Sequence, residues 1–337
     1  MIDVKSIAKD WSFLQGKKIY IACSGGVDST ALVHIASFFG AKLTLLHVNY
    51  HLRKEDSNLD EQLVKQLGAR YRVPVEVKRI DLATQLKKGG NLQEIARTIR
   101  YNWFNEKVID DDSYVLLAHH EDDQIETFYQ HLARKSGIRG MACMTERNGH
   151  FLRPLLNYSK EEIYNFAQNK KLIWREDISN QGNAYSRNKL RNEFLPFLYD
   201  SQANLKESVK LLIQCFQVQL AQLTSDIQPV YEAICKDFIL TFEMFDNLTS
   251  DHHFELFRRF DFSPAQVKAI QELRNAQKGK KIKTKGWELI REDKHYSIMP
   301  SHIERSEKLK LLIEPVSSLP TDFDKNFIYL DLKKIKG

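Results

Sequence analysis

The first half of the chain alternates between two hydrophobic periods, and this alternation restricts the fold more than any other feature. Short apolar runs of strand length are each followed by a longer stretch with helical periodicity. The predicted strands are 18–23, 43–49, 75–80 and 114–119, and the predicted helices are 29–39, 59–71, 91–108 and 122–133. Because strands that alternate with helices form parallel sheets covered on both faces, we predict an α/β fold with a Rossmann-like, doubly wound parallel sheet.

The alternation stops after Leu198, where a second and smaller domain is expected. At 337 residues the chain has room for two or three domains of roughly 150 residues each. The predicted parts are a catalytic domain over 1–200, a connecting helix over 201–225, a mainly helical domain over 226–300 and a tail over 301–337. The mainly helical domain is predicted to end in a basic segment that resembles a β-hairpin.

Composition indicates a soluble, cytoplasmic protein. Hydrophobic residues make up 42% of the chain and charged residues 28%, as in ordinary globular domains. No apolar run reaches the roughly 18 residues that span a bilayer, and charges interrupt the position of a signal peptide's apolar core. The four cysteines lie far apart without a CxxC pair, so zinc ribbons, iron–sulfur ligation and redox dithiols lack their spacing.

Positive charge is concentrated near the end of the second domain. The net charge of +6 is modest, but residues 274–296 hold eight Lys or Arg against three acids. A solvated face is the ordinary explanation of such a segment, and a polyanionic partner is the alternative.

A glycine-rich stretch, SGGVDST, lies between the first predicted strand and the first predicted helix. Such a turn presents backbone N–H groups and the positive end of a helix to an anion. Gly25 and Gly26 leave room for a phosphate, and the hydroxyl groups of Ser24, Ser29 and Thr30 are candidate donors. The alternative is an ordinary tight turn.

The two residues after the glycines decide what kind of phosphate loop this is. The NTP-hydrolysing pattern GxxxxGK[ST] requires a lysine, but Val27 and Asp28 follow the glycines, and GxGxxG does not fit either. A carboxylate beside phosphates is repulsive unless a cation lies between them. Asp28 therefore implies Mg²⁺, and the missing lysine indicates chemistry away from the γ-phosphate.

Two more charged clusters accompany the loop. AHHEDDQIET, residues 118–127, ends the fourth predicted strand and opens a helix, and Arg97 and Arg100 lie one turn apart on the preceding helix. Since ligands bind at the carboxyl ends of strands in open α/β sheets, the loop and the acids are expected to converge on one crevice. Acids that complement a helix dipole and arginines on a solvated helix face remain the alternatives.

The SGGxDS loop resembles the pyrophosphatase loop of the N-type ATP pyrophosphatases, which cleave ATP between the α- and β-phosphates. Four further segments are HVNYHLR (47–53), NLQEIARTIRY (91–101), AHHEDDQIET (118–127) and REDISNQGNAYSRNKLR (175–191). In order, residue type and approximate spacing, these segments and the loop resemble the tRNA(Ile)-lysidine synthetase family over roughly the first 200 residues. The later part, which closes with GWELIREDKHYSI, resembles that family's second domain.

The resemblance implies a reaction and a set of partners. ATP and Mg²⁺ would serve to adenylate the C2 oxygen of the wobble cytidine in the isoleucine tRNA with anticodon CAU, and L-lysine would then displace AMP. The implied contacts to phosphates and Mg²⁺ are Ser24, Gly25, Gly26, Val27, Asp28 and Ser29, with Asp28 and Asp123 on the metal. Asp123 and Glu126 are implied to engage lysine or the metal, and His119, Arg97 and Arg100 to serve the adenylate. Asp177, Asn180, Arg187, Asn188 and Arg191 match the family's polar loop and are implied to touch the tRNA or to shape the site. In the basic segment, Lys280, Lys281, Lys283 and Lys285 are predicted to bind the tRNA.

Three other functions compete with this interpretation. A tRNA 2-thiolation enzyme carries the same loop but typically needs extra cysteines, and the ammonia-using GMP and NAD synthetases would not need a basic second domain. A nucleotide-sensing module would bind ATP without turnover, but the acid-rich segment AHHEDDQIET argues against that function.

Many family members carry a further C-terminal domain, and NFIYLDLKKIKG resembles the lead-in to it, so we expect a shortened or naturally short form. A homodimer is left open.

Overall fold

The computed structural model describes residues 2–52, 55–82, 91–176, 189–202 and 204–301. The chain divides into two compact units, with the boundary between Asp226 and Ile227. Within the described ranges, no helix is both long enough and apolar enough to cross a membrane.

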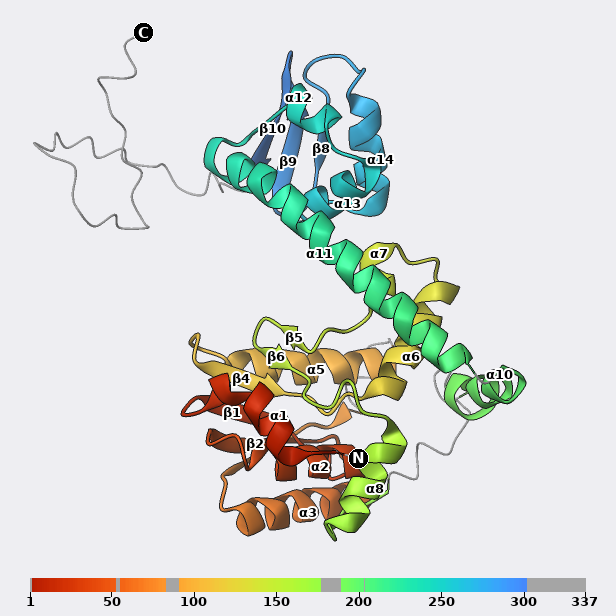
Figure 1. Cartoon of the computed structure of the whole chain (residues 1–337). Helices are drawn as coiled ribbons and strands as arrows, with labels where there is room; N and C mark the ends of the chain where they lie inside the picture. Colours follow the sequence, from red (N-terminus) through yellow and green to blue (C-terminus); the bar gives the residue numbers. More distant parts are fainter. Residues whose placement is uncertain (1, 53–54, 83–90, 177–188, 203, 302–337) are drawn as a thin grey trace, which may run out of the picture. The chain divides into compact units, whose positions relative to one another are not determined.

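The first unit is built on a six-stranded sheet with the strand order β3-β2-β1-β4-β6-β5 (Figure 1). The strands are β1 (Lys18–Ala22), β2 (Lys42–Asn49), β3 (Val75–Arg79), β4 (Ser113–Leu116), β5 (Arg147–Asn148) and β6 (Phe151–Leu152). All neighbouring pairs are parallel except β5 with β6. The chain builds the sheet outward from β1 to β3 and then continues on the other side of β1 with β4. The predicted doubly wound sheet is therefore confirmed, and its switch point lies between β1 and β4.

Helices of the first unit cover both faces of this sheet. The described helices before residue 205 are α1 (Val4–Asp10), η1 (Ser12–Leu14), α2 (Val27–Ala36), α3 (Glu55–Tyr71), α5 (Leu92–Lys107), α6 (Glu121–Ala133), α7 (Ile138–Met141), α8 (Lys160–Asn169), η3 (Leu190–Phe194) and α10 (Leu195–Ser201), of which α7 and α10 pack with α6. Successive strand residues point to opposite faces, so Leu45 packs into a core with α1, α2, α3 and α8, while Leu46 packs with Trp103 and Phe104 of α5.

Two helices of this unit begin at side-chain caps. The Asn91 side chain accepts a hydrogen bond from the backbone N–H of Gln93, where α5 begins. Ser159 and Glu162 form a reciprocal capping box at the start of α8. These caps fix where each helix begins, because side chains satisfy N–H groups that have no partner inside the helix.

The long helix α11 (Leu205–Asp237) crosses the boundary between the units and extends beyond the predicted connector, which ended at residue 225. In the first unit, Val209 and Ile213 pack with Ile125 and Phe128 of α6. The Pro229 ring lies inside the helix without ending it.

The second unit contains more strand than the sequence indicated. A four-stranded antiparallel sheet with the order β7-β10-β9-β8 accompanies three helices. The elements are β7 (Ile239–Thr241), α12 (Phe242–Asp246), α13 (Ser250–Arg258), α14 (Pro264–Leu273), β8 (Lys281–Lys283), β9 (Trp287–Arg291) and β10 (His295–Pro300). Phe257, Phe260, Leu289 and Tyr296 are fully buried in the core between them. The predicted hairpin is part of this sheet.

Candidate functional site

The glycine-rich loop between β1 and α2 closes around the hydroxyl group of Ser29. The Ser29 Oγ accepts hydrogen bonds from the backbone N–H groups of Ser24 (3.3 Å) and Gly25 (3.2 Å) and donates to the carbonyl oxygen of Gly26 (3.0 Å). Gly25 has φ +91°, in the left-handed region that favours glycine. Since Ser29 is only 4% exposed, it shapes the loop from inside, and its predicted contact with a phosphate stays a prediction.

Arg175, the first residue of the predicted polar loop, holds the glycine-rich loop from the other side. Its backbone N–H donates to the carbonyl oxygen of Gly25 at 3.1 Å. Its guanidinium donates to Asp60 Oδ1 (2.9 Å) and Asp56 Oδ1 (3.0 Å) of α3. The loop is thereby tied to α3 through one arginine.

The switch point between β1 and β4 brings together the acids of α2 and α6. His120 is the buried centre of this group. Its Nε2 lies 3.5 Å from Asp123 Oδ2 and 4.0 Å from Asp28 Oδ2, and its Nδ1 lies 3.7 Å from Asp122 Oδ2. The backbone N–H of His120 also donates to Asp123 Oδ2 at 3.1 Å. The acids at the ends of β1 and β4 therefore share one imidazole.

His120, and not the predicted His119, occupies this central position. His119 lies against Arg153, whose Nε donates to His119 Nδ1 at 3.2 Å. Arg153 is 5% exposed and also donates from Nη1 to the carbonyl oxygen of Thr145 at 2.9 Å. The i,i+3 spacing between His120 and Asp123 is the sequence signal that would have identified His120.

Arg97 and Arg100 lie on the exposed side of α5. The Arg97 guanidinium stacks over the Tyr101 ring, 4.5 Å from its centroid. Burial lowers the pKa of Arg153, the charge of Arg97 lowers it further, and Tyr101 opposes both effects. Arg97 is therefore electrostatically linked to the Arg153–His119 pair.

Arg191 of η3, which was predicted to touch the tRNA or to shape the site, reaches into the acid cluster. Its Nε donates to the Glu126 carboxylate, and its Nη2 lies 3.4 Å from Asp123 Oδ1. Burial alone would lower the pKa of Arg191, but the neighbouring carboxylates of Glu126, Asp123 and Asp28 raise it. The remaining predicted residues of this loop, Asp177, Asn180, Arg187 and Asn188, lie outside the described residues.

A lysine that the sequence analysis did not select contacts Asp28. Lys160, the first residue of α8, donates from Nζ to both Asp28 oxygens at 2.6 Å. Its backbone N–H donates to Asp122 Oδ2 at 2.7 Å. Burial would raise the pKa of Asp122, but this hydrogen bond and the charge of Lys206 lower it. No local pattern indicated Lys160, because its partner Asp28 lies 132 residues earlier.

The carboxylates of Asp28 and Asp123 are suited to Mg²⁺ that arrives with a nucleotide. Throughout the described ranges, no group of three or more His, Cys, Asp or Glu is arranged to hold a metal by itself. Magnesium is commonly bound by one or two carboxylates together with substrate phosphates. Asp28 and Asp123, which both lie beside the His120 imidazole next to the phosphate loop, can supply the two carboxylates of such a site.

The four cysteines are separate free thiols. Burial raises the pKa of Cys23 to about 11 and that of Cys143 to about 12, while Cys215 and Cys235 are exposed on α11. Reactive cysteines need a lowered pKa, so Cys23 and Cys143 do not have the environment of a catalytic thiol pair.

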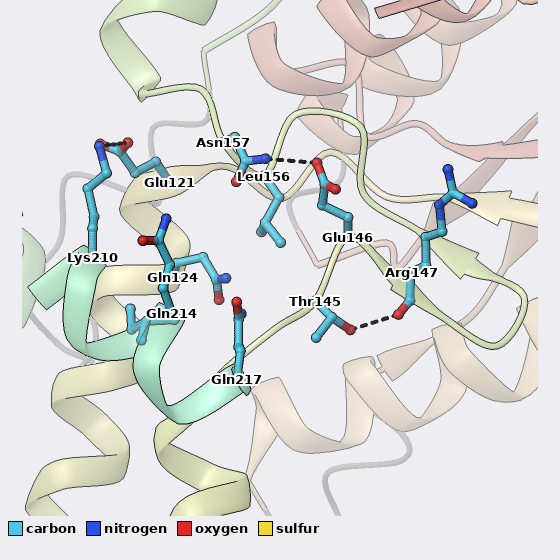
Figure 2. A pocket seen from close by; sticks show the side chains of 11 residues that line it. Glu121, Gln124, Thr145, Glu146, Arg147, Leu156, Asn157, Lys210, Gln214 and Gln217 are labelled. Carbon is cyan, nitrogen blue, oxygen red and sulfur yellow. Dashed lines mark hydrogen bonds and ion pairs between the residues drawn. The ribbon is translucent and has the colours of Figure 1, made fainter. Parts of the chain in front are cut away.

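A cavity of about 680 Å³ is lined by residues of α6, of α11 and of the segment between α7 and α8 (Figure 2). Glu121 and Gln124 line it from α6, and Lys210 lines it from α11. The Glu121 carboxylate pairs with Lys210 (2.8 Å), as Figure 2 shows. Residues two apart in a helix point about 200° apart, so Asp123 and Glu126 face away from this cavity.

The basic segment forms an exposed hairpin in the second unit. Lys281 and Lys283 of β8 both lie 3.2 Å, Nζ to Oε1, from Glu288 of β9. Lys280 and Lys285 flank β8 and are exposed. Two of the four predicted tRNA-contacting lysines are therefore partly neutralised by one acid.

Fold and loop together define the first unit as a PP-loop domain. Residues 2–198 match the family model described as PP-loop domain, and residues 240–300 match the model described as TilS substrate binding domain. The chain is 31% identical over 301 residues to the tRNA(Ile)-lysidine synthase of Bacteroides thetaiotaomicron, covering 86% of this chain and 69% of that protein. It belongs to the tRNA(Ile)-lysidine synthase family, as its motifs predicted.

Other relatives are matched over a smaller part of their length. The tRNA(Ile)-lysidine synthase of Chlorobaculum tepidum is 35% identical over 198 residues, covering 56% of this chain and 59% of that protein. Among solved structures, the U34-tRNA thiolase NcsA of Methanococcus maripaludis with its [4Fe-4S] cluster has a TM-score of 0.52 at 14% identity. That match covers 65% of this chain and 78% of the thiolase, and it shows a shared fold.

Proposed function

We propose that this protein converts the wobble cytidine of CAU-anticodon tRNA(Ile) to lysidine, using ATP and L-lysine and releasing AMP and pyrophosphate. One observation carries the proposal: Asp28 of the phosphate loop and Asp123 of α6 share the buried imidazole of His120. This arrangement lies in a PP-loop domain that is followed by a TilS substrate binding domain.

In the first step, the C2 oxygen of cytidine attacks the α-phosphorus of ATP, and the bond between the α-phosphorus and its bridging oxygen breaks. Pyrophosphate leaves and the tRNA carries an adenylate. The loop, bounded by Ser24 and Ser29, receives the phosphates at the N-terminus of α2. When bound by Asp28 and Asp123, Mg²⁺ would offset negative charge on the phosphates. His119, Arg97 and Arg100 are proposed to serve the adenylate.

In the second step, the ε-amine of lysine attacks C2, and the bond from C2 to the adenylate oxygen breaks to release AMP. The free amine has a pKa of about 10.4, so it must lose a proton near neutral pH. Asp123 and Glu126 are proposed to hold the lysine ammonium group and to accept that proton. Arg191 positions both carboxylates, since it contacts each of them.

The second unit is proposed to bind the tRNA. Its exposed hairpin carries Lys280, Lys281, Lys283 and Lys285, and lysines that neutralise phosphates supply sequence-independent affinity. Arg187 and Asn188 of the polar loop are proposed to contact the tRNA or to shape the site. The homodimer and the cytoplasmic location stay predictions.

The direct test incubates the protein with ATP, Mg²⁺, radiolabelled lysine and the CAU isoleucine tRNA, and then counts acid-insoluble label. Label that survives mild alkaline deacylation and requires ATP is the expected result. The matched control is the same tRNA with uridine at the wobble position, which should remain unlabelled. Pyrophosphate release that depends on tRNA but produces no label would retain the adenylation step and contradict lysine as the nucleophile. The absence of both signals would contradict the proposal.

A further inference from the structure

Lys160 is in contact with the two helix starts that frame the phosphate loop. Its Nζ donates to both oxygens of Asp28 in the first turn of α2, and its backbone N–H donates to Asp122 in the first turn of α6. Because α8 packs against α2, the backbone position of Lys160 is held by tertiary packing. The lysine side chain remains 45% exposed, so a ligand at the loop can reach its amine.

The negative charge of Asp28 beside the loop would repel bound phosphates, and the Lys160 amine can offset that charge. Asp28 follows the glycines directly, and a nucleotide polyphosphate bound there would face its carboxylate. The backbone N–H groups of Ser24, Gly25 and Gly26 are engaged by the hydroxyl groups of Ser29 and Ser24 within the loop. A side chain from outside the loop can therefore supply donors to the phosphates that these engaged N–H groups do not, in addition to the proposed Mg²⁺.

We infer that Lys160 binds the pyrophosphate half of the nucleotide and takes the role of the lysine that the loop itself lacks. In the structure, Asp28 holds the Lys160 amine at the mouth of the loop. When phosphates bind, the amine turns from the carboxylate to the phosphate oxygens, a short movement for a flexible side chain with three N–H donors. The inference rests on the proposed function only in assuming that nucleotide phosphates bind at this loop.

A neighbouring lysine offers a matched control. Lys206 of α11 lies 3.0 Å from Glu121 and 3.2 Å from Asp122, so it carries the same charge beside the same helix start. Both ion pairs of Lys206 go to these two acids of α6, whereas Lys160 pairs with Asp28 of α2. If Lys160 acted only through general positive charge near α6, Lys206→Gln should have the same effect as Lys160→Gln.

The first experiment measures the affinity of the full chain for inorganic pyrophosphate, a non-hydrolysable ATP analogue and AMP by titration calorimetry with Mg²⁺. Lys160→Gln is expected to weaken binding of the first two ligands about tenfold to a hundredfold, as for a lost charge-assisted hydrogen bond. AMP should bind unchanged, Lys160→Arg should retain most of the affinity, and Lys206→Gln should resemble the unaltered protein. Circular dichroism confirms that each variant is folded.

A second experiment separates phosphate binding from a purely structural pairing. In EDTA, Asp28→Asn is expected to strengthen pyrophosphate binding, because the repulsive carboxylate is gone and the Lys160 amine is released. Adding Lys160→Gln to Asp28→Asn should remove that gain. If Lys160 served only to pair with Asp28, the double variant would bind as tightly as Asp28→Asn.

The outcomes distinguish this inference from the proposed function. Unchanged pyrophosphate affinity in folded Lys160→Gln would overturn the inference and leave the proposed function in place. An equal loss for AMP would also overturn it, because the effect would then not arise from the pyrophosphate half. An unaltered protein that binds no nucleotide would overturn both.

Discussion

The Arg191 guanidinium donates a hydrogen bond to the carboxylate of Glu126 in α6, which lies 65 residues earlier in the chain. Glu126 is only 1% exposed. The guanidinium also lies 3.4 Å from Asp123, so one arginine balances two acids that the proposed chemistry requires. Two buried carboxylates so close together would repel each other and lose their hydration without a cation. The ion pair of Arg191 with Glu126 is therefore expected to stabilise the first unit.

Replacing Arg191 with methionine should lower the free energy of unfolding of the first unit by about 1–3 kcal/mol, because buried acids lose a hydrogen-bonded partner. The value is below that of a fully buried pair, since the Arg191 side chain is 37% exposed and water reaches it. Urea unfolding followed by tryptophan fluorescence measures the change.

A double-variant cycle provides the control for that prediction. Glu126→Gln removes one of the two negative charges, so Arg191→Met should cost less in the Glu126→Gln background than alone. Equal costs in both backgrounds would contradict the pairing of Arg191 with Glu126.

Asp28→Ala should reduce tRNA-dependent pyrophosphate release by at least about a hundredfold while the protein stays folded, because the carboxylate is proposed to hold the metal at the phosphates. A pyrophosphate-coupled assay measures the rate. The matched control is Asp110→Asn, an acid that pairs with Lys18 at the opposite end of β1. Retained turnover in Asp28→Ala would contradict the metal role.

Neutral substitution of Lys280, Lys281, Lys283 and Lys285 to glutamine should weaken tRNA binding and flatten its dependence on salt, because fewer counterions are released. Glu288→Gln should have the opposite effect, since Glu288 lies 3.2 Å from both Lys281 and Lys283 and its removal frees two positive charges. Filter binding over a range of salt concentrations measures both slopes. Slopes that do not change would show that the hairpin is only a solvated surface.

Glu61 is expected to make stability depend on acid pH. Its carboxylate accepts hydrogen bonds from Arg79, Lys65 and Asn49, and the Arg79 interaction is the largest cause that lowers its pKa from 4.5 to about 2. A lowered pKa in the folded state means that the stabilisation is fully present above about pH 4.5 and is lost as the pH falls toward 2. Glu61→Gln should therefore differ from the unaltered protein most at neutral pH.

Urea midpoints of both proteins between pH 7 and pH 3 test this dependence. The difference should be constant near neutrality and should shrink below about pH 4.5. Glu106→Gln is the control, because Glu106 is 63% exposed and pairs only loosely with Lys78 at 3.6 Å. A difference between Glu61→Gln and the unaltered protein that does not change with pH would contradict the lowered pKa.

The sequence alone allowed prediction of the parallel sheet, the helix starts and the phosphate loop, because each depends on local features. Hydrophobic period distinguishes strand from helix, side chains such as Asn91 and Ser159 cap helices within a few residues, and only glycine readily adopts the φ of Gly25. The short strand β7 was missed, and the predicted hairpin was not recognised as part of a four-stranded sheet, since strand formation in such segments depends on partners far along the chain.

Tertiary structure alone decided which charged groups meet. Lys160 and Arg191 pair with carboxylates that lie 132 and 65 residues away along the chain, so no local pattern indicates either pair. The order of β1 and β4 in the sheet brings α2 beside α6, and the direction of the first turn of α6 selects His120 over His119 as the shared imidazole. The sequence by itself determined which charged and polar groups are present at this site. The packing of the sheet and helices determined which of them pair, because contacts between distant segments depend on the whole fold.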